Sequence, residues 1–504
     1  MSSIKKLAGQ TLWYGVSSIF ARFLLYLLTP YLTGKFAGTS QYGEMTLVYS
    51  LIPFLNTLVL FGFETAYFRY IQKKHHEADV YNTLTSSLLI TTCVLTVLTL
   101  VFKDGIAKFI RVEDHPEYIT ISAFIIAFDA LSALPFAKLR HFGRPKKFAF
   151  IRISGILLNI AIAYFFLSIC PSLARKHPNS VFLVLYSAGF GVGYVLIANL
   201  SQSLFQVIAL SRELGQFQWK LDRALWKDII VYSLPLTIAG FGGMINETFD
   251  RIMLGKRSAL IGEAAKYEVG IYGACYKLSI LITLFVQAFR MGAEPFFFKQ
   301  SGEDGAPKIY ARVMKFFVIT ISLMFLVVGL YLDIWKGFIR DEKMWQGLKV
   351  VPILLFANMF LGIYYNLSIW YRLSQRTAPG AYITLIGAAI TLVINYVFIP
   401  RYSYMACAWA TFLCYGSMMV ISFVWGQQVY RIPYAWKKLL AYMAIVALIY
   451  FFHLGLTSIF PGRKFNLGLA TLLTAVYAWF ILQIEKKEFQ RISILAKWIP
   501  FITR

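Results

Sequence analysis

Long apolar runs, each about as long as a membrane-spanning helix, follow one another along almost the whole chain. A helix needs about 20 apolar residues to cross the hydrocarbon layer of a bilayer. We therefore expect an all-α, polytopic membrane protein. The apolar runs predict fourteen spans, near 11–33, 45–68, 81–102, 118–137, 148–169, 181–210, 229–254, 268–298, 313–333, 347–370, 378–399, 403–426, 435–457 and 465–484.

Composition supports a membrane protein and argues against a soluble enzyme. Hydrophobic residues make up 58% of the 504 residues and charged residues 14%, whereas soluble domains carry about 25% charged residues. The loops between the runs are too short for a soluble catalytic domain, and the sequence has no HExxH, GxSxG or Walker motif. We expect no enzyme activity, no metal site and no cofactor. The cysteines are expected to be small core residues: Cys93, Cys170, Cys275, Cys407 and Cys414.

Basic residues indicate which side of the membrane each loop occupies. The net charge is +25, but in so apolar a chain it does not suggest a nucleic-acid partner. The basic clusters at 138–147, 212–227 and 299–315 and the basic tail from 486 fall on one side if the spans alternate. Cytoplasmic loops carry the excess of Lys and Arg. Both termini are therefore predicted to be cytoplasmic.

The segment 211–228 divides the chain into two halves. It interleaves aromatic and basic residues like an interfacial amphipathic helix, and we interpret it as a cytoplasmic linker. A weak repeat supports this division, because Gly34-Lys35 and Tyr42-Gly43 in the first half resemble Gly255-Lys256 and Tyr272-Gly273 in the second. The prediction is a six-helix lobe in 1–210, a second in 229–426, and two further helices with a basic cytoplasmic tail in 427–504.

Ionisable residues inside the spans are the candidates for function, because charges in a membrane are costly. Arg22 lies near the middle of the first span, too deep to reach the interface easily. It either faces a wet cavity or pairs structurally with a carboxylate such as Glu64 or Asp129. Arg152 and Lys349 lie near span ends, where long side chains reach the interface. The other candidates are the cations Arg251, Lys277 and Arg290 and the carboxylates Glu247, Asp250 and Glu294.

Spacing on the helices predicts partners for several of these charges. Glu247 and Arg251 are four residues apart and can pair along one helix face, either as a structural pair or as one that a substrate phosphate breaks. Arg290 and Glu294 are also four residues apart and are expected to form a structural pair. Lys277 is expected to face the lumen. Asp129 suits a proton or cation site, or pairing between helices.

Cations in both halves imply an anion inside the membrane region. A phosphate fits, because the Arg fork matches it and a low dielectric strengthens the attraction. Arg22, Arg251, Lys277 and Arg290 are the candidates for binding a diphosphate in a central cavity. Glu64, Asp129, Glu247, Asp250 and Glu294 are the candidates for H⁺ or Na⁺ coupling or for charge pairing.

Several short motifs resemble one known family. They are Arg22 with Pro30 and Thr33, Gln41-Tyr42-Gly43-Glu44, Ser233-Leu234-Pro235, Asp250-Arg251-Ile252-Met253-Leu254 and Val269-Gly270-Ile271-Tyr272. The chain resembles the bacterial oligosaccharide flippases (Wzx type) of the multidrug/oligosaccharidyl-lipid/polysaccharide (MOP) exporter superfamily, which also contains lipid II flippases and drug antiporters.

The resemblance implies two six-helix lobes around a cationic cavity, with the last two helices as an accessory pair. It implies movement of an undecaprenyl diphosphate-linked oligosaccharide, a repeat unit of capsule, O-antigen or another polysaccharide, from the cytoplasmic to the periplasmic leaflet of the bacterial inner membrane by alternating access. Arg22 and Arg251 match the family's basic lumen positions best, and Lys277 less closely. Other polysaccharide assembly proteins are possible partners.

Three alternatives stay open at this point. A drug or cation antiporter of the same superfamily would use the buried carboxylates. A lipid II flippase would share the architecture and an Arg in the first helix. A membrane glycosyltransferase or polymerase would need a catalytic loop outside the membrane.

Overall fold

The computed structural model describes residues 19–72, 76–176, 186–300, 305–373 and 378–490. In these ranges the chain forms helices and no strands. Twelve of the helical stretches are long and apolar enough to cross a membrane, and the apolar helix Gly193–Ala209 is shorter. The first predicted span, 11–33, is described only from residue 19, as a helix over 19–27 followed by α2. The all-α polytopic fold is confirmed.

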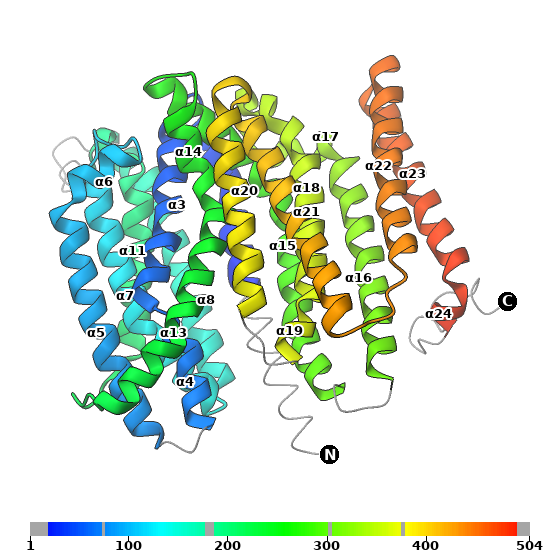
Figure 1. The fold of residues 1–504 in the computed structure, drawn as a ribbon. Helices are drawn as coiled ribbons and strands as arrows, with labels where there is room; N and C mark the ends of the chain where they lie inside the picture. Colours follow the sequence, from blue (N-terminus) through cyan, green and yellow to red (C-terminus); the bar gives the residue numbers. More distant parts are fainter. Residues whose placement is uncertain (1–18, 73–75, 177–185, 301–304, 374–377, 491–504) are drawn as a thin grey trace.

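The helices of the first half form one side of the molecule (Figure 1). After residues 19–27 they are α2 (Thr29–Lys35), α3 (Gln41–Leu60), α4 (Phe63–Gln72), α5 (Glu77–Val101), α6 (Lys103–Phe109), α7 (Glu117–His141), α8 (Pro145–Tyr164), the π-helical turn η1 (Phe165–Ile169), α9 (Cys170–Lys176), the short η2 (Ala188–Phe190), α11 (Gly193–Ala209) and α12 (Ser211–Leu214).

The helices of the second half form the other side, with the last two long helices outermost. They are α13 (Arg223–Met244), the π-helical turn η3 (Ile245–Phe249), α14 (Asp250–Arg257), α15 (Glu263–Gln300), α16 (Ala306–Gly329), α17 (Leu332–Trp335), η4 (Lys336–Phe338), η5 (Glu342–Val350), α18 (Val351–Leu367), α19 (Ile369–Leu373), α20 (Ala378–Tyr402), α21 (Tyr404–Val429), α22 (Trp436–Ile459), α23 (Arg463–Ile484) and α24 (Lys486–Gln490).

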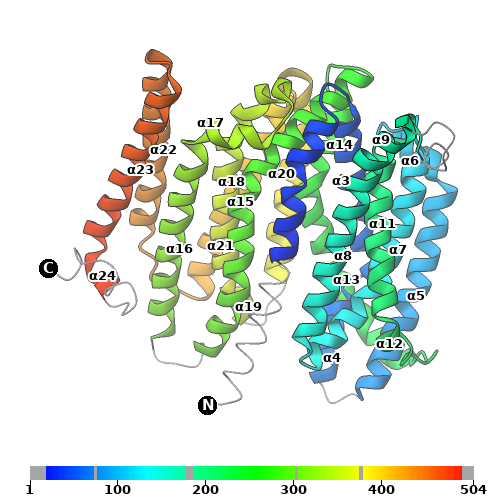
Figure 2. The ribbon, with the colours of Figure 1, turned by 180° about the vertical axis from the view of Figure 1, so that it is seen from behind.

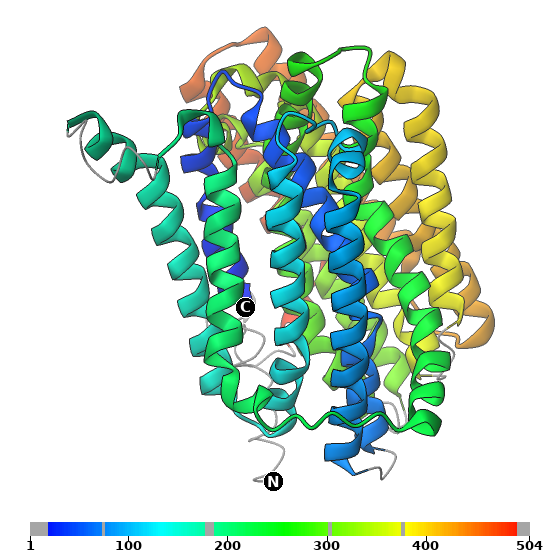
Figure 3. The ribbon, with the colours of Figure 1, turned by 90° about the vertical axis from the view of Figure 1, so that its left-hand side faces the viewer.

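The two halves meet at one end of the bundle. We call the end with α14 and α17, at the top of Figure 1, the upper end, and the end with α4 and α19 the lower end. The ribbons of the two halves are closest at the upper end and separate toward the lower end (Figures 1 and 2). The exception is α13, which packs on α3, α4 and α5 as well as on α20. Figure 3 shows α13 running the length of the bundle beside the first half.

The sixth predicted span is shorter than expected. An apolar helix was expected over 181–210, but α11 begins only at Gly193. Gly191 adopts a φ of 36°, which a glycine reaches without the strain of a side chain. The glycine-rich segment therefore turns the chain before the helix starts.

The linker is also different from its prediction. The interfacial helix expected over 211–228 does not form, because only Ser211–Leu214 and the residues from Arg223 are helical. Between them, side chains of α5 bind the backbone: Asn82 accepts from the N–H of Gln218 at 2.9 Å, and Thr83 accepts from Asp222 at 3.3 Å. These contacts satisfy backbone groups that a helix would otherwise pair.

The apolar core agrees with the cysteine prediction except at one position. Cys170, Cys275, Cys407 and Cys414 are buried, whereas Cys93 on α5 is exposed. An outward-facing cysteine fits a lipid-facing helix surface, because the lipid is itself apolar.

Candidate transport cavity

A cavity of about 360 Å³ lies where the two halves meet. Its lining comes from the helix at 19–27, α2, α3, α8 and α11 of the first half and from η3, α14 and α15 of the second. The polar residues among the lining are Thr29, Tyr42, Thr46, Tyr49, Ser50, Asn159, Asn199, Glu247, Thr248, Arg251, Tyr276 and Lys277.

The polar face of α3 supplies four of these residues. Tyr42, Thr46 and Ser50 are four residues apart and Tyr49 is three after Thr46, so the four share one face of the helix. The hydroxyls of Thr46 and Ser50 each donate to the carbonyl four residues earlier, at 2.8 and 2.7 Å. This spacing is visible in the sequence and could have identified the face, but our sequence analysis followed charges only.

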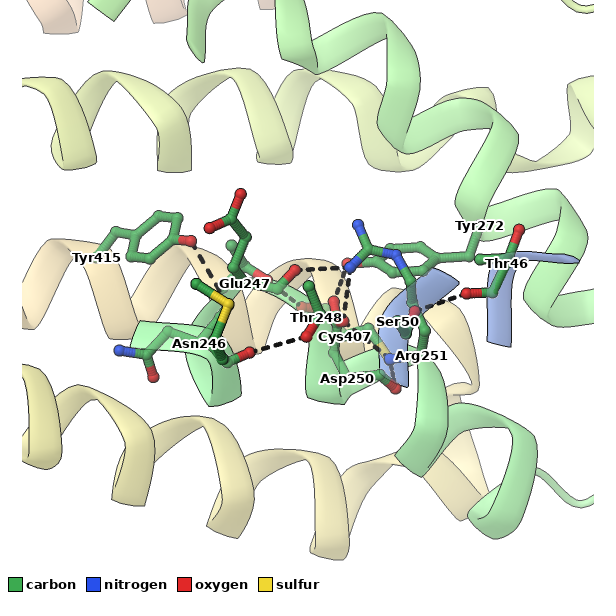
Figure 4. A network of polar contacts seen from close by, with 12 residues as sticks. Thr46, Ser50, Asn246, Glu247, Thr248, Asp250, Arg251, Tyr272, Cys407 and Tyr415 are labelled. Carbon is green, nitrogen blue, oxygen red and sulfur yellow. Dashed lines mark hydrogen bonds and ion pairs between the residues drawn. The ribbon is translucent and has the colours of Figure 1, made fainter. Parts of the chain in front are cut away.

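The π-helical turn η3 places a buried charge pair beside the cavity (Figure 4). Asp250 is 1% exposed, and its carboxylate accepts from the Tyr272 hydroxyl at 2.6 Å and from Arg251 Nη1 at 3.4 Å. The Arg251 guanidinium also lies 4.2 Å from the centre of the Tyr276 ring. The predicted lumen residue Arg251 therefore does line the cavity, already paired.

Glu247 does not pair as its spacing predicted. Arg251 Nη1 donates to the backbone carbonyl of Glu247 at 2.6 Å, and the carboxylate it approaches belongs to Asp250. The π-helical turn widens the helix between the two residues and changes their register. The Glu247 carboxylate lines the cavity and makes no hydrogen bond or ion pair with any described residue (Figure 4).

Lys277 lies on α15 one position after Tyr276 and lines the same cavity. Among the described residues it has no hydrogen-bond or ion-pair partner. An unpaired ammonium in a half-buried position needs water or an anion to compensate its charge. Lys277 is therefore the cation best placed to meet an anionic ligand.

Arg22 lies at the edge of this cavity rather than in it. It precedes the lining residue Leu25 by about one turn on the side of the lower end, and its side chain is exposed. Its guanidinium donates to the side-chain oxygen of Gln287 on α15. The structure thus places Arg22 between the two halves, below Lys277.

The other candidate residues lie elsewhere. Arg290 is 13 residues beyond Lys277 on α15, about 20 Å along the helix, and packs on the Tyr365 ring at 4.8 Å. Glu64 pairs with Arg140, and Asp129 accepts from Ser203 at 2.7 Å near Arg152. The Glu294 side chain lies outside the described residues.

A buried ion cluster joins the halves at the upper end, above the cavity. Lys266 of α15 contacts Glu44 of α3 at 2.9 Å, Asp114 of the loop before α7 at 3.1 Å and Glu263 at 3.1 Å. Lys266 and Glu44 are both buried. Sequence reasoning missed this cluster because its members lie at span ends, where charges are ordinary.

Two glycines let α3 and α15 cross closely beside this cluster. A Cβ at Gly43 would overlap the Lys266 carbonyl, and a Cβ at Gly270 would lie 3.1 Å from the Gly43 nitrogen. Asp341 adds contacts to both sides, accepting from the backbone N–H of Gly38 at 2.9 Å and from Tyr267 at 3.0 Å. The halves are thus closed against each other at the upper end.

Comparison with protein families identifies the chain. Residues 7–300 match the family model described as polysaccharide biosynthesis protein. The chain belongs to this family. Residues 257–397 also match the MatE family model, and no curated protein matches in sequence.

Solved structures share the fold of this polysaccharide biosynthesis family member. Lipid II flippase MurJ in an inward closed conformation has a TM-score of 0.67 at 13% identity, over 93% of this chain and 98% of that chain. A multidrug resistance MATE family transporter of the MOP superfamily, facing inward, has a TM-score of 0.59 at 15% identity, over 83% and 95% of the two chains. The resemblance noted in the sequence is confirmed at the level of family and fold.

Proposed function

We propose that this protein is a flippase that moves an undecaprenyl diphosphate-linked oligosaccharide from the cytoplasmic to the periplasmic leaflet of the bacterial inner membrane. The observation that carries the proposal is the unpaired Lys277, in a polar cavity lined by both halves. A diphosphate is the group that such a cation, with Arg22 nearby, would bind most strongly. Family membership supports a polysaccharide precursor as the substrate.

The transport step follows from the closed upper end. With the predicted orientation the upper end is periplasmic, so the diphosphate enters from the lower, cytoplasmic side. It passes Arg22 and reaches Lys277, while the lipid tail stays in the bilayer. Rocking of the halves then separates α3 from α15 and exposes the site to the periplasm. Because Arg251 is paired with Asp250, it influences the diphosphate through the electrostatic field of the pair and does not bind it directly.

Ion coupling, where it operates, centres on Glu247. An ion drives transport only by binding the two conformations differently. Asp250 and Glu64 are held by cations and Asp129 by Ser203, whereas the Glu247 carboxylate faces the cavity without such a partner. Transport by Glu247→Gln should lose its response to an imposed H⁺ or Na⁺ gradient, while the wild type keeps it. Equal responses would remove Glu247 from the coupling role.

The decisive experiment measures lipid-linked glycans in cells lacking the gene. Deletion should cause a complete undecaprenyl-linked unit to accumulate, and mass spectrometry would identify it. Wild type should cure the accumulation and Lys277→Gln should not, because the variant lacks the unpaired charge. Lys108→Gln, which removes an exposed charge on α6, is the matched control and should rescue. Rescue by Lys277→Gln would contradict the proposed role of Lys277, and no accumulation in the deletion strain would contradict the flippase itself.

One observation favours a second candidate, a drug or cation antiporter. The unpaired Glu247 carboxylate in the cavity suits a cationic substrate as well as a coupling ion. An antiporter would lose efflux of cationic dyes on Glu247→Gln and keep it on Lys277→Gln. A flippase would show no dye efflux in either variant.

A further inference from the structure

A second polar cavity lies at the upper end, away from the proposed transport cavity. Its volume of about 690 Å³ is within the range of small-ligand sites, about 300–1,000 Å³. One wall comes from α17, η4 and η5, and the other from the hairpin between α22 and α23. None of its lining residues belongs to the transport cavity.

Asp333 fixes the polar groups of this cavity. Its carboxylate accepts from Lys336 Nζ at 2.7 Å and from the side-chain amide of Asn466 on α23. The hydrogen bond from Lys336 holds the pKa of Asp333 below its usual range. The carboxylate is therefore ionised and occupied, and it orients one side chain from each wall.

The Asn466 amide leaves an acceptor free. Because its nitrogen donates to Asp333, its carbonyl oxygen points the other way. That oxygen is buried and has no hydrogen-bond partner among the described residues. A buried acceptor without a donor is unfavourable. Because the oxygen is closed to solvent, a ligand hydroxyl can reach it only after the side chains around it move.

The cavity also presents cations. Arg463 lines it, is exposed and has no hydrogen-bond or ion-pair partner among the described residues. The first turn of α23 holds Arg463 and Lys464 and no acidic residue. Cations are unfavourable at a helix N-terminus, where the backbone dipole is positive. An anionic ligand at Arg463 would remove this mismatch.

Trp345 supplies a flat apolar surface. Its indole N–H donates to the carbonyl of Ile339 at 2.9 Å, which fixes the orientation of the ring. Lys336 Nζ lies 5.0 Å from the ring centre. A fixed aromatic ring beside two cations is a combination suited to a sugar ring that carries an acidic group.

We propose that this cavity binds an acidic saccharide at the upper end. Arg463 and Lys336 bind the acidic group, and the sugar ring packs near Trp345. With the predicted orientation, this is the periplasmic side, to which the proposed flippase delivers its glycan. Binding of a free sugar requires no transport, so this inference and the proposed function can fail separately.

The test is saturation-transfer NMR on the full-length protein in phosphatidylcholine nanodiscs. The probe is glucuronate, with glucose as the neutral comparison. We expect saturation transfer to glucuronate, with a Kd on the order of 1 mM, and weaker transfer to glucose. Arg463→Gln should weaken glucuronate binding about tenfold or more, because a hydrogen bond to a charged group is lost. Lys464→Gln is the matched control, since it removes the same charge one residue away, from a side chain that does not line the cavity.

Three results would overturn the proposal. The first is no saturation transfer to glucuronate with the wild type. The second is an equal loss in Arg463→Gln and Lys464→Gln, which would mean unspecific attraction to the basic turn. The third is loss of the glucuronate signal when phosphatidylglycerol replaces phosphatidylcholine, which would assign the cavity to a lipid headgroup.

Discussion

Single residues in the cavity differ in how far their charge is compensated. Asp250 accepts hydrogen bonds from Arg251 and Tyr272, whereas Lys277 and Glu247 have no such partner among the described residues. Substitutions at the buried pair and at the unpaired charges should therefore affect different properties. Removing one member of the pair should affect stability, and removing the unpaired charge should affect transport.

The buried pair gives a stability prediction. Asp250→Asn leaves the buried Arg251 guanidinium without its counter-charge, which should cost about 3–5 kcal/mol. Thermal unfolding of the protein in detergent should show a clear drop in Tm. Glu64→Gln is the control, because it breaks the half-exposed pair with Arg140 and should cost under about 1 kcal/mol. An unchanged Tm in Asp250→Asn would mean that water reaches Arg251.

Residue types could be predicted from the sequence better than their partners. The rule that charges are costly in a membrane found Arg251, Lys277 and Glu247, which do line the cavity. It could not give the contact of Arg22 with Gln287, which depends on how two distant helices pack. It gave the wrong partner for Arg251, because a π-helical turn changes the register that ideal helix spacing assumes.

The sequence predicted the helices well where the length of an apolar run determines them. It predicted them poorly where glycines or side chain-to-backbone hydrogen bonds end a helix. The long spans appear where hydropathy placed them, while the linker and the start of α11 do not. Tyr42-Gly43 and Tyr272-Gly273, which suggested a repeat, both lie where α3 and α15 cross, since a Cβ at Gly273 would lie 2.7 Å from the Thr46 side chain. Their equivalence in the sequence therefore corresponds to a close contact between the halves.

One buried carboxylate adds polar contacts where the last two long helices pack on the second half. Glu485, at the end of α23, accepts from Lys315 of α16 at 2.8 Å, from Lys438 at 2.6 Å and from the Tyr442 hydroxyl. Burial raises the pKa of Glu485, but these hydrogen bonds more than offset it, so its pKa is below the usual range. An ionised Glu485 therefore strengthens the attachment of α23 to α16.

This attachment should weaken only in acid. A carboxyl group whose pKa is lowered by folding adds stability above its unfolded pKa of about 4.3, and this stability is lost as the pH falls through the folded pKa. Tm should be steady from about pH 8 to pH 5 and fall below that. Glu485→Gln should start lower and show a smaller fall. A parallel fall in both proteins would assign the acid sensitivity to other groups.

The described residues close the molecule at its upper end, and one lysine is central to this closure. Lys266 compensates Glu44, Asp114 and Glu263 together, and the Gly43–Gly270 crossing lies beside it. No sequence rule pointed to this lysine, because the cluster forms only when the two halves meet. Conformational exchange between closed and open upper ends must break these ion pairs.

Removing Lys266 should therefore open the upper end. Lys266→Gln leaves Glu44 buried beside two other carboxylates, and their repulsion favours separation of the halves. Spin labels at Ala37 and Ala259, in a variant with Cys93→Ser, should report a longer distance by pulsed electron paramagnetic resonance. Lys147→Gln breaks a pair with Glu213 inside the first half and is the control, expected to leave the distance distribution unchanged. Should Lys266→Gln keep the wild-type distribution, the glycine crossing and Asp341 alone would hold the end closed, and the ion cluster would have no part in setting the conformation.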